Sequence, residues 1–353
     1  MDLLNIIKVL TPAGIAFAVG IVITPLITRH LYKHKAWKKK PGKLTLSGTE
    51  AVEFNKLHKD REREVPRMGG IVIWGSALIT ILGMGAVAIL WPTAQTVKMD
   101  FLSRAQTWIP FFALAIGAIV GLANDFLDIY NQGNGLPLRR RLFVIIAMAI
   151  FIGWWFYEKL DIVAVGIPFA QPLEIGWLII PFFVLVTLAL YASGTIDGID
   201  GLAGGVFATI FAAYSVIALA QNQIDLAAFS AMLVGAILAF LWFNIPPARF
   251  FMTETGTMAL TLTLATIVFM TDTLGEGIGI AVLPIIGFLL VVTVGSSILQ
   301  LLSKKFINKK IFRIAPFHHH LEALGWSGPK VAMRYWILGA VFAFLGVIVA
   351  LVG

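Results

Sequence analysis

The sequence contains no cysteine, and only 13% of its 353 residues are charged. The absence of cysteine excludes a disulfide framework, a thiolate nucleophile and a cysteine-ligated metal. Soluble domains carry about 25% charged residues, so a chain with half that share and 59% hydrophobic residues needs lipid as its solvent. The composition therefore predicts an integral membrane protein.

Ten apolar stretches are long enough to cross a hydrocarbon core about 30 Å thick, which takes about 20 helical residues. They lie near residues 5–28, 70–92, 107–124, 141–157, 176–192, 202–220, 226–244, 256–271, 278–302 and 331–352. We therefore expect an all-α, polytopic membrane protein with about ten transmembrane helices, forming a single membrane domain over residues 1–353. An even number of crossings puts both termini on one side of the membrane.

The distribution of positive charge predicts the orientation. The longest polar segment, near residues 29–68, is rich in lysine and arginine and should be cytoplasmic. The loops near 125–140, 193–201, 245–255 and 303–330 then share its side. When Arg141 and Arg334 at the loop edges are counted with them, only Lys8, Lys98, Arg104 and Lys159 of the 27 lysines and arginines fall elsewhere. The net charge of +8 is thus explained by the positively charged cytoplasmic loops, and we expect no nucleic-acid partner. We expect extracytoplasmic termini and a retained first helix, because no cleavage site follows it.

Two pairs of aspartates recur with the same spacing in the predicted cytoplasmic loops. Asp125 and Asp128 share one face of a helical turn, where they can hold a divalent cation; a solvated helix end is the alternative. Asp197 and Asp200 lie in the glycine-dense segment 193–205, which allows backbone to approach a ligand closely and helix amides to receive phosphate. A tight helix–helix turn with an aspartate cap is the alternative there.

Three more polar clusters lie on the same predicted face. Arg249 and Glu254 follow the seventh span, and a lone glutamate before a helix is more often a cap than a catalyst. Arg67 opens the second span beside two glycines, Gly69 and Gly70, whose amides can hold anionic groups.

Three consecutive histidines, His318, His319 and His320, follow a basic run. They cannot all face one metal from a regular helix, but imidazoles can contact a diphosphate or relay a proton.

Carboxylates, histidines and a basic rim on one membrane face suit Mg²⁺ and a heavily phosphorylated soluble substrate, while a lipid enters from the bilayer. Mg²⁺ and cationic side chains that neutralise the transferring group are the physics of phosphoryl transfer. A transporter is the weaker hypothesis, because it would place charges at mid-membrane and show internal repeats.

Five motifs in order resemble the phospho-N-acetylmuramoyl-pentapeptide transferase family over nearly the whole chain. They are Pro-x-Met-Gly-Gly (66–70), Asp-Phe-Leu (125–127), Asp-Gly-Ile-Asp-Gly-Leu-Ala (197–203), Phe-Met-x-x-x-Gly (251–256) and Pro-Phe-His-His-His-x-Glu (316–322). The resemblance implies ten helices around an inward-facing site in the bacterial plasma membrane. It implies Mg²⁺-dependent transfer of phospho-MurNAc-pentapeptide from UDP-MurNAc-pentapeptide to undecaprenyl phosphate, which gives lipid I and UMP for peptidoglycan. A homodimer is a further expectation.

The resemblance also implies roles for individual residues. Those expected to be catalytic are Asn124, Asp125, Asp197, Asp200, His318, His319 and His320; those expected to bind substrate are Arg67, Gly69, Gly70, Asp128, Gly194 and Arg249; and Asp125 and Glu254 are expected to bind Mg²⁺.

Three positions depart from the family pattern. Asn124 replaces the first of two adjacent aspartates, and its amide can ligate a cation but cannot act as a base. Gly194 replaces an asparagine, and Glu254 replaces an aspartate and reaches one methylene further. Two alternatives therefore stay open. One is a polyprenyl-phosphate GlcNAc-1-phosphate transferase, whose branch resembles residues 55–58, and the other is a non-catalytic relative that binds lipid.

Overall fold

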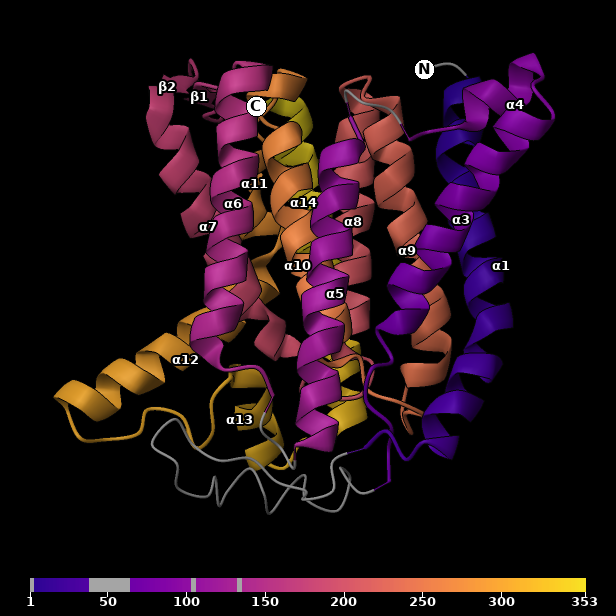
Figure 1. Ribbon diagram of the computed structural model, residues 1–353. Helices are drawn as coiled ribbons and strands as arrows, with labels where there is room; N and C mark the ends of the chain where they lie inside the picture. The colour runs from indigo at the N-terminus through magenta and orange to yellow at the C-terminus, as the bar shows by residue number, and fades with distance from the viewer. Residues whose placement is uncertain (1–2, 38–63, 103–105, 132–134) are drawn as a thin grey trace.

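The computed structural model describes residues 3–37, 64–102, 106–131 and 135–353, which form an almost wholly helical bundle (Figure 1). Ten of its helices are long and apolar enough to cross a membrane, which confirms the all-α, polytopic prediction. They are α1 (Leu3–Lys33), α3 (Ile71–Leu90), α5 (Trp108–Tyr130), α6 (Leu138–Leu160), α7 (Ile179–Ser193), α8 (Leu202–Ala220), α9 (Ile224–Asn244), α10 (Thr253–Met270), α12 (Phe288–Phe306) and α14 (Gly328–Val352). The 3-10 turns η1 (Gly176–Leu178) and η2 (Gly194–Ile196) continue α7 at its two ends.

The shorter elements mark the two ends of the bundle. At one end lie α4 (Ala94–Met99), a two-stranded antiparallel hairpin and η3 (Thr273–Gly275); the hairpin pairs β1 (Ala164–Val165) with β2 (Leu173–Glu174). We call this the hairpin end. The helix α13 (Phe317–Ala323) lies at the opposite, α13 end. The start of α1 and the end of α14 both lie at the hairpin end (Figure 1), as an even number of crossings requires.

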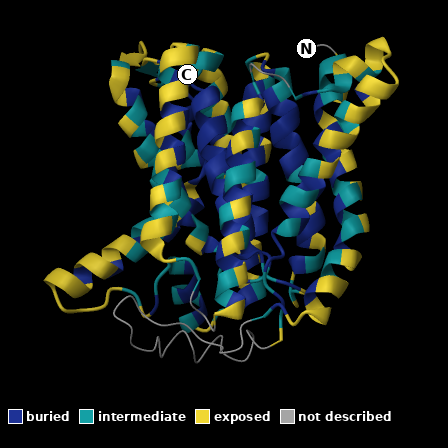
Figure 2. Ribbon diagram, in the orientation of Figure 1, coloured by how far each residue is buried: buried dark blue, intermediate teal, exposed yellow. Residues whose placement is uncertain are grey.

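Buried residues concentrate in the central helices α8, α9 and α10, whereas the outer helices expose one side (Figure 2). Helix α10 is buried from Thr255 to Met270. Two glycines of α5 let the backbones of α5 and α10 touch: a Cβ on Gly117 would lie 2.7 Å from Ala259 Cα, and one on Gly121 would lie 2.2 Å from the Glu254 carbonyl oxygen. Small residues at such contacts are how membrane helices pack closely. This contact brings the acidic end of α5 against the first turn of α10.

Several helices extend beyond the predicted spans, and three of the differences bear on the site or the shape of the bundle. Helix α5 runs on to Tyr130, so Asp125 and Asp128 lie inside a helix that the sequence ended at 124. Helix α10 begins at Thr253, three residues early. The predicted span 278–302 is two helices, α11 (Gly279–Ile286) and α12, separated by Gly287. Pro284 lies inside α11 and lacks the amide that would bond the carbonyl of Ile280, which weakens the helix just before the break at Gly287. Helix α12 then slants away from the bundle (Figure 1).

Asp272 anchors the hairpin to the helices at the hairpin end. Its carboxylate is fully buried and accepts hydrogen bonds from the amides of Gly166 (2.7 Å) and Ile280 (2.9 Å). Burial raises the pKa of Asp272 to about 6, although these backbone donors oppose the shift. The carboxyl therefore binds its proton more tightly in the folded chain than in the unfolded chain.

This shift predicts a pH-dependent stability. The free energy of unfolding should fall by up to about 3 kcal/mol as pH rises from about 4 to about 6, and then level off, because the native state holds more protons in that window. Thermal unfolding in detergent across pH 4–8 measures it. Asp272→Asn should lose this dependence, and an unchanged slope in the variant would assign the effect to another group.

Candidate active site

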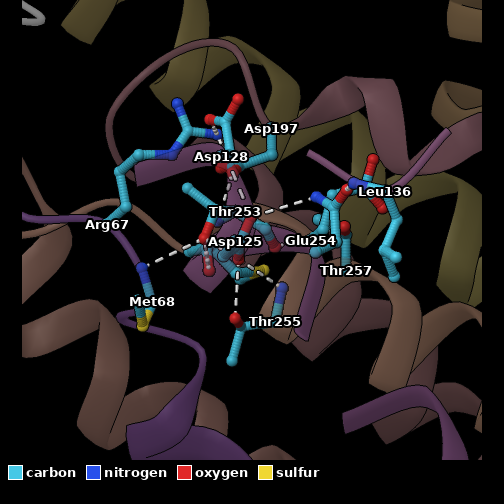
Figure 3. Close-up of polar contacts among 12 residues, drawn as sticks. Arg67, Met68, Asp125, Asp128, Leu136, Asp197, Thr253, Glu254, Thr255 and Thr257 are labelled. Atoms are coloured by element: carbon cyan, nitrogen blue, oxygen red, sulfur yellow. Dashed lines mark hydrogen bonds and ion pairs between the residues drawn. The ribbon is translucent and has the colours of Figure 1, made fainter. Parts of the chain in front are cut away.

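The site at the α13 end is centred on Asp125. This aspartate is fully buried, and its Oδ2 accepts three hydrogen bonds, from Thr253 Oγ1 (2.5 Å), Thr255 Oγ1 (2.6 Å) and the Thr255 amide (2.8 Å) (Figure 3). Short bonds from several donors hold this oxygen in place. Its Oδ1 is less engaged, because Asn124 Nδ2 lies 3.4 Å away and Arg67 Nη2 lies 4.0 Å away. One oxygen of Asp125 is therefore fixed by the protein and the other is available.

Asp128 lies on the same face of α5 as Asp125, as the three-residue spacing predicted. Arg67 Nη2 is 3.4 Å from Asp128 Oδ2 and contacts both carboxylates (Figure 3). The side chain of Arg67 is mostly buried, and its Nε has no hydrogen-bond partner in the part of the chain that the structure describes. Arg67 thus reaches the aspartates, as its assignment to the site requires.

Glu254 lies in the first turn of α10 and pairs with Arg141, whose Nη1 is 2.6 Å from Glu254 Oε1. No sequence motif marks Arg141 as a site residue, because it is the last of three consecutive arginines, Arg139–Arg141, at the edge of a predicted loop. Arg139 and Arg140 are exposed, whereas Arg141 is partly buried. Arg141 could have been distinguished from its two neighbours by its position on α6, because it is the one of the three that lies on the side of the helix facing the protein.

Thr253, which the sequence analysis also missed, joins three motifs. Its backbone is left-handed, with φ of +58°. Its amide donates to Asp197 Oδ2 (2.8 Å), its hydroxyl donates to Asp125, and that hydroxyl oxygen accepts a hydrogen bond from the Met68 amide (3.1 Å) (Figure 3). The two aspartate pairs, which are far apart in the sequence, therefore meet at one threonine.

Two of the three histidines face the aspartate loop. His318 and His319 of α13 are buried, with ring centroids 4.3 Å apart, and His319 Nδ1 lies 2.8 Å from Glu322 Oε2. A Cβ on Gly198 would lie 2.5 Å from His319 Nε2 and 2.8 Å from His318 Nε2. The backbone between Asp197 and Asp200 therefore lies directly against both imidazoles.

His320 points elsewhere, which corrects the expectation that all three histidines act together. Its Nδ1 accepts a hydrogen bond from the Arg313 amide (3.1 Å), and its ring packs against Phe312 and Phe317. Successive helical residues project about 100° apart, so three in a row cannot converge. His320 holds the segment before α13 in place.

The predicted anion-binding amides of Gly69 and Gly70 are also used otherwise. They donate to the carbonyl oxygens of Phe251 (2.8 Å) and Met252 (3.1 Å). A Cβ on Gly70 would lie 2.2 Å from the amide nitrogen of Gly256. Both glycines thus join the segment before α3 to the start of α10, and their amides are not free to hold an anion.

The other assigned residues occupy the edges of the site. Asn124 Oδ1 accepts a hydrogen bond from the Leu136 amide (3.0 Å), and Asp200 Oδ2 accepts one from the Ala248 amide (3.3 Å). Gly194 lies near Thr257, because a Cβ on Gly194 would lie 3.2 Å from Thr257 Cβ.

Arg249 is exposed and lies over the ring of Phe243, 5.3 Å from its centroid. No ion pair joins Arg249 to a carboxylate within the described ranges. The structure therefore leaves this arginine outside the carboxylate cluster.

The donor set suits a hard divalent cation. Four carboxylates (Asp125, Asp128, Asp197 and Glu254) and two guanidinium groups (Arg67 and Arg141) leave a net charge of −2, and carboxylate oxygens are the ligands that Mg²⁺ prefers. No three His, Cys, Asp or Glu side chains among the described residues already form a metal-binding group. A cation held here would use Oδ1 of Asp125 and the carboxylate of Glu254, where it would compete with Arg141.

Comparison with known proteins places this site in a family. The model of glycosyl transferase family 4 matches residues 107–272, which include the acidic ends of α5 and α10. The phospho-N-acetylmuramoyl-pentapeptide-transferase of Anoxybacillus flavithermus is 31% identical over 343 residues, which cover 96% of this chain and 97% of that protein. The enzymes of the same name from Bacillus thuringiensis and Bacillus cereus are 32% identical over 348 residues, covering 96% of each chain. Because these relatives are more than 30% identical over nearly their whole length, the chain belongs to the phospho-N-acetylmuramoyl-pentapeptide-transferase family.

Proposed function

We propose that this protein transfers phospho-MurNAc-pentapeptide from UDP-MurNAc-pentapeptide to undecaprenyl phosphate at the cytoplasmic face of the bacterial plasma membrane, giving lipid I and UMP. The observation that supports this most strongly is the meeting of Asp125 and Asp197 at Thr253, at one end of a membrane bundle. On this proposal the nucleotide comes from the cytoplasm and the lipid phosphate from the bilayer, and the two meet at that end of the bundle. The expected homodimer stays a prediction, which light scattering of the purified protein tests.

The reaction exchanges one diphosphate bond for another. An oxygen of the lipid phosphate attacks the phosphorus bound to the sugar, the bond from that phosphorus to the bridging oxygen of the uridine phosphate breaks, and UMP leaves. A phosphomonoester has a second pKa near about 6, so the lipid phosphate is mostly dianionic at neutral pH and needs no base. This favours direct attack, because no base is required and Asn124, which stands where the family pattern has an aspartate, cannot act as one.

The remaining residues position and neutralise charge. Mg²⁺, when held by Asp125 and Glu254, would neutralise charge on the diphosphate. Arg67 has donors left over after its contacts with the aspartates, and positively charged groups stabilise the charge of the transferring phosphoryl group. His318 and His319 lie across the Asp197–Asp200 loop, where imidazole nitrogens can contact the sugar-linked phosphate.

The test is UMP release by the purified protein with undecaprenyl phosphate, with and without Mg²⁺. We expect Mg²⁺-dependent release with UDP-MurNAc-pentapeptide and none with UDP-GlcNAc. Release with UDP-GlcNAc instead would move the protein to the GlcNAc-1-phosphate branch. No release with either substrate, from protein that is monodisperse and unfolds cooperatively, would favour a non-catalytic relative.

A further inference from the structure

The ion pair between Arg141 and Glu254 links α6 to the site. Arg141 Nη1 lies 2.6 Å from Glu254 Oε1, and the two side chains are 19% and 31% exposed. The Nε of Arg141 is buried and has no hydrogen-bond partner among the residues that the structure places. The pair is therefore partly desolvated, and its arginine keeps unused donors.

The guanidinium of Arg141 and a hard cation would compete for the carboxylate of Glu254, because Arg141 already occupies Oε1 and its positive charge opposes a second cation nearby. Breaking a desolvated pair is strongly unfavourable when either charge is left alone. It becomes favourable when both charges gain new partners at once. A divalent cation suits the freed carboxylate, and a diphosphate suits the freed arginine, whose fork of donors matches phosphate oxygens.

We propose that Arg141 is a nucleotide-binding residue that stays paired with Glu254 until a divalent cation binds the glutamate. Before the cation binds, Arg141 neutralises Glu254. When the cation takes the carboxylate, the guanidinium turns to a diphosphate oxygen of the nucleotide substrate. This inference rests on the proposed function, and it makes cation and nucleotide binding reciprocal, so that each strengthens the other.

The first measurement is Mg²⁺ affinity without nucleotide, by titration calorimetry on detergent-purified protein. Arg141→Gln should bind Mg²⁺ about tenfold more tightly than the wild type, because the competitor of the cation is gone. The second measurement is UDP affinity at saturating Mg²⁺, which should weaken about tenfold in the same variant through loss of a charge-assisted phosphate contact. Shifts of opposite sign are the signature, since a merely structural arginine would weaken both.

Arg139→Gln is the matched control. Arg139 belongs to the same helical turn and is exposed, and a spacing of two residues turns it about 200° away from Arg141. Both affinities should stay at wild-type values. Arg141→Lys is the second variant should Arg141→Gln fail to fold: it keeps the positive charge, so Mg²⁺ affinity should be unchanged, but it lacks the fork, so UDP affinity should fall.

Two results would overturn the inference. Unchanged or weaker Mg²⁺ binding in Arg141→Gln would show that the arginine does not compete with the cation, and unchanged UDP binding would show that it makes no phosphate contact. A wild type that binds no Mg²⁺ at millimolar concentrations would overturn both the inference and the cation in the proposed function. If the Mg²⁺ and UDP affinities of Arg141→Gln shift in opposite directions but the wild type releases no UMP, the inference is supported and only the proposed transfer reaction is contradicted.

Discussion

Asp125→Asn should lower the rate of UMP release at least about 10³-fold, the scale seen when a preorganised charge-stabilising group is removed, and should leave the protein folded. The asparagine oxygen can still accept the bonds that Thr253 and Thr255 donate to Oδ2. Its amide nitrogen would then replace Oδ1, the less engaged oxygen that faces Arg67 and Asn124. The variant therefore removes the charge and the available ligand while preserving the internal hydrogen bonds.

Steady-state UMP release and thermal unfolding of the same preparation separate these two effects. Asp161→Asn is a suitable control, because Asp161 is exposed at the C-terminus of α6 with φ of +51°, a conformation that asparagine adopts readily. It should match the wild type in rate and in Tm. Near-normal turnover in Asp125→Asn would remove Asp125 from the mechanism.

Glu254→Gln should lower the rate at least about 10²-fold by removing a negatively charged ligand of the cation. Glu254→Asp restores the residue that the family pattern has at this position and should keep most of the activity. The shorter side chain also retreats from Arg141, which now lies 2.6 Å from the glutamate. Comparing the two variants therefore shows whether the rate depends on the negative charge of residue 254 or on the length of its side chain.

Rates measured over a range of Mg²⁺ concentrations distinguish the two glutamate variants. The glutamine variant should require more Mg²⁺ for half-maximal rate, whereas the aspartate variant should stay within a few-fold of the wild type. A glutamine variant with the Mg²⁺ requirement of the wild type would exclude Glu254 as a ligand.

Hydropathy was enough to predict the membrane spans, because a run of about 20 apolar residues is rare outside membrane-spanning helices. It was insufficient where polar groups are satisfied by tertiary contacts. Asp125 and Asp128 look like a loop in sequence, yet they continue α5 because Thr253, Thr255 and Arg67 supply their partners. The interruption at Gly287 was missed for a different reason, since an apolar window is insensitive to the amide that Pro284 lacks.

The site was predicted in part for a similar reason. The motifs that resemble the family single out Asp125, Asp197, His318 and His319, which the structure brings to one end of the bundle, and their catalytic roles stay predictions. Thr253 was missed, because a threonine in a membrane helix is ordinary until its left-handed backbone is known.

The assignments of Gly69, Gly70 and His320 failed because hydrogen-bonding capacity can be inferred from a residue type, whereas its actual use depends on neighbours. The amides of the glycines are taken by the carbonyls before α10, and the ring nitrogen of the histidine is taken by the Arg313 amide.

The central position of α10 has a consequence for how the protein responds to its bilayer. Helices that face lipid tilt or bend when bilayer thickness changes, and α12, which slants away from the bundle, exposes large apolar side chains such as Ile298 and Leu299. Helix α10 is enclosed by protein from Thr255 to Met270, so it meets almost no acyl chains. Its first turn, which holds the threonines and Glu254, should keep its geometry in thin and thick membranes alike. Sensitivity to acyl-chain length should therefore reside in the outer helices.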